Sequence, residues 1–113
     1  MKWFTAKGPY QHVIDFIDAA SESEKLSERL EELEQEPENM RHIRLAEIRT
    51  RMVHDKVPAE HIEIIDLMGN ADILSAMNRV IREIREAGIS LARLNRKQPC
   101  ASFQALISLL PAP

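Results

Sequence analysis

Apolar residues recur at alternating intervals of four and three between Ile73 and Leu94, and this spacing constrains the fold more than any other feature. It places one apolar seam along a helix, because a helix has about 3.6 residues per turn. The seam consists of Ile73, Met77, Val80, Ile84, Ala87, Leu91 and Leu94. Gly88 interrupts it, at a cost of about 1 kcal/mol relative to alanine within a helix. Because Leu91 and Leu94 stay in phase, we expect one helix over residues 71–95; the alternative is a helix that ends at Gly88.

Two shorter segments before this seam also have helical periodicity. An apolar stripe around Phe16 predicts a first helix that begins near Pro9, since proline suits an early helical position. The leucines that follow are rotated from this stripe by more than about 90°, so one straight helix could not bury both. We therefore expect a break near Ser21, with Ser21 and Glu24 as a capping box. Pro37 should end the acidic segment.

Three other features extend the helical pattern. Residues 38–56 carry apolar side chains around most of the helix circumference, which is typical of a helix that packs on two sides. A further helix is expected to begin at Pro58 and to close at Gly69. A last apolar helix is expected over about residues 99–110, in a stretch without any charged residue.

Charge alternates in blocks along the chain. Residues 21–38 hold eight glutamates and two basic residues, a net charge of −6, and residues 39–56 hold five basic and two acidic residues, a net charge of +3. The next two blocks repeat the alternation, with −4 over residues 57–78 and +4 over residues 79–97. Each surface pair stabilises a fold by only about 0–1 kcal/mol. The pattern nevertheless favours antiparallel helices, each beside one of opposite sign.

These segments together predict an all-α fold, an antiparallel helical bundle of four to five helices. We expect a single domain over residues 1–113, with a short lead-in at residues 1–8, because a chain of this length suits one core. Hydrophobic residues make up 44% of the chain, close to a globular average. Only three glycines occur, which disfavours the tight hairpin turns of a β-rich fold.

The sequence favours a cytoplasmic location. The single cysteine, Cys100, cannot form an internal disulfide, which fits a reducing compartment. The first residues lack the apolar core of a signal peptide. No run of about 18 apolar residues predicts a membrane span.

No motif in the sequence predicts catalysis, a cofactor or a metal. The four histidines are His12, His42, His54 and His61, and none belongs to a recognisable ligand motif. Cys100 lies on the apolar face of the expected last helix, where a cysteine is more often a small core residue than a nucleophile. We therefore expect a protein that is not an enzyme and that has no cofactor or metal site.

The apolar faces point instead to protein–protein interaction. Together they exceed what a five-helix monomer readily buries, so we expect a protein partner of unidentified kind and self-association as a homodimer. The expected function is a small cytosolic interaction module, whether regulator, inhibitor, adaptor or chaperone-like. The candidate residues, for the core or an interface, are Ile73, Met77, Val80, Ile84, Leu91, Leu94, Phe103, Leu106, Ile107 and Leu110.

The alternative function is a nucleic-acid-binding regulator that uses the basic block at residues 79–97. Five arginines could form a patch for anions or for an acidic partner: Arg79, Arg82, Arg85, Arg93 and Arg96. The net charge of −3 makes this alternative weaker, since nucleic-acid-binding domains are usually basic. Salt would discriminate between the two functions, because phosphate binding weakens steeply with ionic strength.

Overall fold

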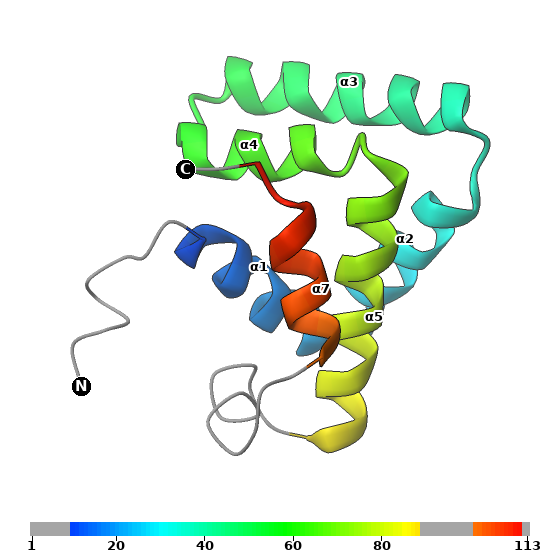
Figure 1. Ribbon diagram of the computed structural model, residues 1–113. Coiled ribbons are helices and arrows are strands. Elements are labelled where there is room, and N and C mark those ends of the chain that lie inside the picture. The colour runs from blue at the N-terminus through cyan, green and yellow to red at the C-terminus, as the bar shows by residue number, and fades with distance from the viewer. Residues whose placement is uncertain (1–9, 89–100, 112–113) are drawn as a thin grey trace.

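The computed structural model describes residues 10–88 and 101–111, and this part of the chain forms six helices, of which α5 is the central one (Figure 1). The all-α prediction is confirmed, since helices account for 83% of the described residues and no strand occurs among them. The described part holds six helices, one or two more than predicted. They are α1 (Gln11–Ser21), α2 (Glu24–Gln35), α3 (Glu38–His54), α4 (Ala59–Leu67), α5 (Ala71–Ala87) and α7 (Ala101–Leu109).

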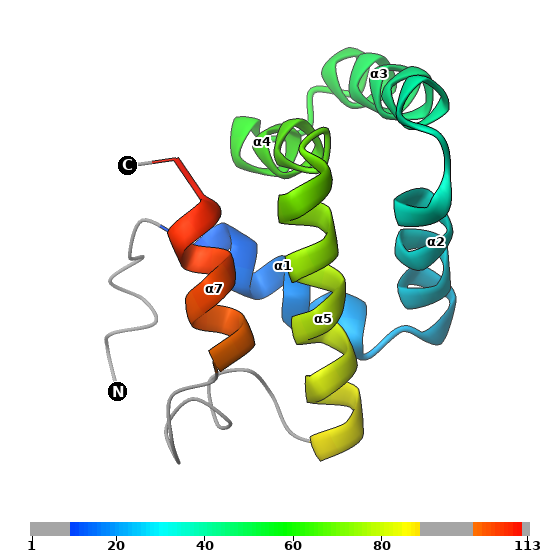
Figure 2. The same ribbon diagram turned by 45° about the vertical axis from the view of Figure 1, so that its right-hand side comes forward.

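Helix α5 is the centre of the molecule and contacts α1, α2 and α7. Helices α2 and α7 run antiparallel to α5, while α1 crosses it (Figures 1 and 2). Helices α3 and α4 form an antiparallel pair that lies across one end of α5 (Figure 2). An antiparallel bundle therefore describes only the part around α5.

The apolar seam of α5 lies inside the core of its own chain. Ile73, Met77, Val80 and Ile84 are each no more than 4% exposed, and all four belong to the main hydrophobic cluster. Helix α7 adds buried apolar residues to the same cluster, namely Phe103, Leu106 and Leu110, with Ile107 half-buried against it. The uncharged last helix is thus covered within the chain by α5.

Helix α5 ends at Ala87, so the expected continuous helix over residues 71–95 is wrong. Gly88 adopts the left-handed conformation, with φ 72°, and its N–H donates to the Ile84 carbonyl at 2.8 Å. Glycine reaches this conformation without the steric cost that a Cβ imposes, and it ends helices for this reason. The predicted positions Leu91, Leu94, Arg93 and Arg96 lie outside the described residues.

The break between α1 and α2 occurs where expected, but another serine caps it. Ser23 is extended, with φ −119° and ψ 108°, and its hydroxyl accepts a hydrogen bond from the Leu26 N–H at 3.1 Å. Extended geometry is what an N-cap residue requires. Ser21 remains helical, and its hydroxyl donates back to the Asp18 carbonyl at 2.7 Å. The predicted capping box of Ser21 and Glu24 is therefore wrong, because the N-cap is Ser23, two residues after Ser21.

Helices from charge blocks of opposite sign lie side by side in two places. Acidic α2 packs on α5, where Arg82 Nη2 lies 3.2 Å from Glu31 Oε2. Basic α3 packs on acidic α4, where Arg49 Nε lies 2.8 Å from Asp66 Oδ1. All four side chains are about half-exposed, so these pairs contribute little to stability.

Candidate protein-interaction surface

Helix α3 lies at the outer edge of the molecule in both views (Figures 1 and 2). Its principal contact is with α4, and only Arg41 and Leu45 of its 17 residues are buried. The described residues include five large hydrophobic side chains that are exposed, and α7 supplies only one of them, Leu109. The other four belong to α3 and are Met40 at 40%, Ile43 at 52%, Ile48 at 44% and Val53 at 52% exposed.

Part of this exposed surface forms a regular row. Ile43, Ala46, Thr50 and Val53 follow one another at intervals of three, four and three residues, and all four are exposed. At 100° per residue they lie within about 80° of one another around the helix. We call these four residues the outer α3 stripe. Buried Leu45 is on the opposite half of the helix, so the stripe faces away from α4.

Charged residues border the outer α3 stripe on both sides. Glu47 and Arg51 lie along one edge, and neither side chain makes a hydrogen bond or ion pair within the described part of the chain. Arg49 lies along the other edge and is paired with Asp66. An exposed apolar row with a charged border is typical of a surface that contacts another protein.

The inner side of α3 contains a buried cation without good partners. Arg41 is 4% exposed, and its Nε is the only buried side-chain nitrogen or oxygen in the described residues that lacks a hydrogen-bond partner. The ion pair of Arg41 with Glu38 is long, at 3.9 Å, and Glu38 is mostly exposed. Burial of a poorly paired charge is unfavourable. We therefore expect the burial of Arg41 to lower the stability of the chain.

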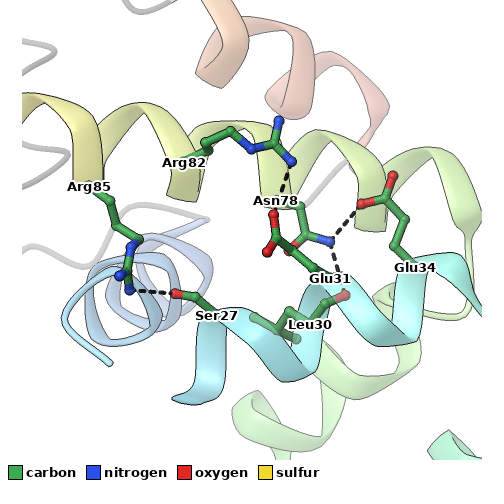
Figure 3. Close-up of polar contacts among 7 residues, drawn as sticks. All are labelled: Ser27, Leu30, Glu31, Glu34, Asn78, Arg82 and Arg85. Atoms are coloured by element: carbon green, nitrogen blue, oxygen red, sulfur yellow. Dashed lines mark hydrogen bonds and ion pairs between the residues drawn. The ribbon is translucent and has the colours of Figure 1, made fainter. Parts of the chain in front are cut away.

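The interface of α2 and α5 is polar by comparison (Figure 3). Asn78 is 3% exposed, and its amide group donates to the Leu30 carbonyl at 3.0 Å and to Glu34 Oε1 at 2.7 Å. Ser27 is also buried; its hydroxyl donates to the Ala20 carbonyl at 2.7 Å and accepts from Arg85 Nη1 at 3.2 Å. These contacts fix how α2 sits on α5.

A groove of about 350 Å³ opens beside this polar interface. It is lined by Glu24, Ser27, Glu28, Glu31, Asn78, Ile81, Arg82, Arg85 and Glu86. Only Ile81 among them is apolar, whereas small-molecule pockets are mostly apolar with a few convergent polar groups. The buried amide of Asn78 and hydroxyl of Ser27 already have partners in the chain. The groove therefore does not resemble a catalytic pocket.

The described part of the predicted basic patch lies against acidic residues. Arg82 and Arg85 both line this groove and contact α2, through Glu31 and Ser27 respectively (Figure 3). Arg79 is exposed on α5. Since four glutamates line the same groove, a phosphate backbone would meet negative charge beside each arginine. This placement does not favour the nucleic-acid alternative.

The histidines of the described residues do not gather into one site. His12 Nε2 lies 2.7 Å from Glu63 Oε1, between α1 and α4, and His54 Nδ1 lies 3.2 Å from Asp55 Oδ1. Within the described ranges, no group of three or more His, Cys, Asp or Glu side chains could hold a metal ion. Nor does any helix there have the length and apolar character needed to cross a membrane.

The sequence predicted that α3 packs on two sides; in the described residues one side packs on α4 and the other is exposed, so packing on the second side stays a prediction. The spacing of Ile43, Ala46, Thr50 and Val53 was the available signal, and the stronger seam of α5 obscured it. The burial of Arg41 has no counterpart in the sequence pattern.

Comparison with known proteins identifies no relative, since no family model, curated protein or solved structure matches the chain. The interpretation of α3 therefore depends on its own chemistry.

Proposed function

We propose that this chain is a small protein-interaction module that acts by helix-mediated binding, with the outer α3 stripe as its contact surface. The observation that carries the proposal is that two large apolar side chains, Ile43 and Val53, are exposed together on the outer face of one peripheral helix, whereas Met40 and Ile48 lie elsewhere around it. Scattered apolar residues are ordinary on protein surfaces, but a grouped set marks an interaction site. We also propose a cytoplasmic location, because a single cysteine suits a reducing compartment.

The burial of the α5 seam changes where such an interface can lie. Ile73, Met77, Val80 and Ile84 are covered by helices of the same chain and cannot also contact a second protein. Helix α3 packs on α4 with one side and is exposed on the other, and its sequence pattern predicts packing on both sides. The proposal therefore places the contact surface on α3. A regulator, an inhibitor, an adaptor and a chaperone-like protein would all use such a surface.

Photo-crosslinking in cells of the native host tests the proposal. A benzophenone amino acid replaces Ile43 in one variant and Arg29, exposed on α2, in a control variant. Irradiation should produce discrete crosslinked adducts from position 43 and few or none from position 29. The proposal fails if position 43 produces no adduct, or if both positions produce the same adducts in equal amount. Thermal unfolding of both variants should match that of the natural chain, because both positions are exposed.

A further inference from the structure

We infer that the occupant of the outer α3 stripe is a second copy of this chain, with the two α3 helices packed antiparallel about a two-fold axis at the level of Ile48. The inference rests on the proposed function, because it names the partner of that same surface. Three observations lead to it: the symmetry of the stripe, the order of residue sizes along it and the charges at its edges.

The stripe is symmetric about residue 48. In an antiparallel pair with this axis, Ile43 lies opposite Val53 of the second copy, and Ala46 lies opposite Thr50 of the second copy. Each contact occurs twice, as a two-fold interface requires. The small residues meet at the centre, so the helices can approach closely, and the larger residues meet at the two ends. One short row of side chains is thus complementary to itself.

The border charges favour the antiparallel direction. Glu47 and Arg51 lie along the same edge, and the pairing brings Glu47 of one copy beside Arg51 of the other, twice by symmetry. Both side chains lean toward the N-terminus of their own helix, which moves them toward each other. Neither has another partner within the described residues. On the other edge the two Arg49 side chains approach, but each is already neutralised by Asp66 of its own chain.

A parallel pair would lose these contacts. It would place Glu47 beside His42 of the second copy and Arg49 beside His54, and it would leave Arg51 without a carboxylate. Identical residues would then meet along the stripe, with Ala46 opposite Ala46 and Thr50 opposite Thr50. The two directions therefore predict different neighbours for the same positions, and crosslinking can distinguish them.

The small size of the surface indicates a weak dimer. A stable interface uses roughly 20–30 residues on each side, and one 17-residue helix supplies fewer. We expect a dissociation constant on the order of 100 µM, typical of a transient contact. At a few micromolar the chain should have the mass of a monomer, 13.0 kDa. At several hundred micromolar the average mass should approach twice that value.

Two single-cysteine variants test the pairing, Ala46→Cys and Thr50→Cys, each in a Cys100→Ser background. Both positions are exposed, and circular dichroism should confirm that the variants fold as the natural chain does. Each variant is incubated alone, and the two are incubated together, in a glutathione redox buffer. Disulfides need Cβ atoms about 3.5–4.5 Å apart. In the antiparallel pair, residue 46 of one copy lies opposite residue 50 of the other. The two cysteines are therefore close enough to bond only when the two different variants pair.

The expected result is a disulfide-linked dimer in the mixture, about tenfold more abundant than with either variant alone. Equal crosslinking of each variant with itself would show a parallel pair and overturn the inference. The same holds if no crosslinking above background occurs, or if the chain remains a monomer at several hundred micromolar. In these cases the proposed function survives if photo-crosslinking at position 43 links the chain to a protein of different mass.

A charge reversal provides a second test at the same edge. Glu47→Arg places like charges beside each other in the antiparallel pair, and it should raise the dissociation constant about tenfold in sedimentation experiments. Adding Arg51→Glu restores opposite charges across the interface and should return the constant to its natural value. The inference fails if the double variant associates no better than the single variant.

Discussion

Arg41 lies on the inner side of α3 with 4% of its surface exposed, and its Nε has no hydrogen-bond partner. An unsatisfied buried donor costs about 1–3 kcal/mol, and replacing buried charges with apolar side chains is often neutral or stabilising. We therefore expect Arg41→Met to raise the free energy of unfolding by about 1 kcal/mol or more, measured by urea denaturation. Arg29→Met, at an exposed position on α2, is the matched control and should change it by less than about 0.5 kcal/mol. A loss of stability in Arg41→Met would show that the guanidinium stabilises the α3–α4 contact.

Asn78 has the opposite role, because its buried amide is well paired. It donates to the Leu30 carbonyl and to Glu34, so a carboxylate in its place would face only acceptors. We expect Asn78→Asp to lower the free energy of unfolding at pH 7 by about 3 kcal/mol. Asn78→Leu, of similar volume and without charge, should cost about 1 kcal/mol. Chemical denaturation measures both, and equal losses would mean that the buried charge of the aspartate adds no cost beyond the loss of the hydrogen bonds.

At the scale of a single helix, Gly88 decides where α5 ends. A Cβ at this position would meet no atom of the described residues within 4 Å, so the obstacle to alanine that these residues show is the positive φ of 72°. We expect Gly88→Ala to destabilise the chain by about 1 kcal/mol. Gly88→Asn should cost less, since asparagine tolerates this conformation better than alanine does. If alanine instead raised the melting temperature, the helix would continue through residue 88, as its periodicity suggested.

The extents of the helices show what the sequence could predict and what it could not. All six segments had visible periodicity, although the predicted number of helices was four to five. Alternating charge is consistent with α2 beside α5 and α3 beside α4, but it did not specify these pairs. The choice between Ser21 and Ser23 as cap, and between an end and a continuation at Gly88, depends on differences of about 1 kcal/mol that tertiary contacts settle. Periodicity alone contains no such information.

The candidate surface was less predictable for a related reason. An apolar seam must be covered, but its spacing does not say whether the same chain or a second one covers it. The α5 seam was therefore a candidate for both core and interface, and the structure buries Ile73, Met77, Val80 and Ile84 inside the chain. Helix α3 is apolar on several sides, so only the position of α4 reveals that Ile43 and Val53 face outward.

At the scale of the whole molecule, the helices form two regions, one around α5 and one made of α3 and α4. Helices α1, α2 and α7 surround α5 and bury its apolar face, whereas the α3–α4 pair lies across the end of α5 (Figure 2). Within the described residues, α3 has α4 as its principal neighbour and an exposed outer face. Because the apolar seam of α5 is buried within the chain, we assign contact with a second copy to α3.

Hydrogen–deuterium exchange at two protein concentrations tests this central claim most directly. Amides in the middle of α3 should exchange about threefold or more slowly at about 500 µM than at about 5 µM, because association protects the helix by mass action. Amides of α5 and α7 should exchange at the same rate at both concentrations, since their apolar faces are already buried in the monomer. In the Ile43→Glu variant the concentration dependence of α3 should disappear. Exchange in α3 that is independent of concentration, or protection gained in α5 instead, would contradict the account.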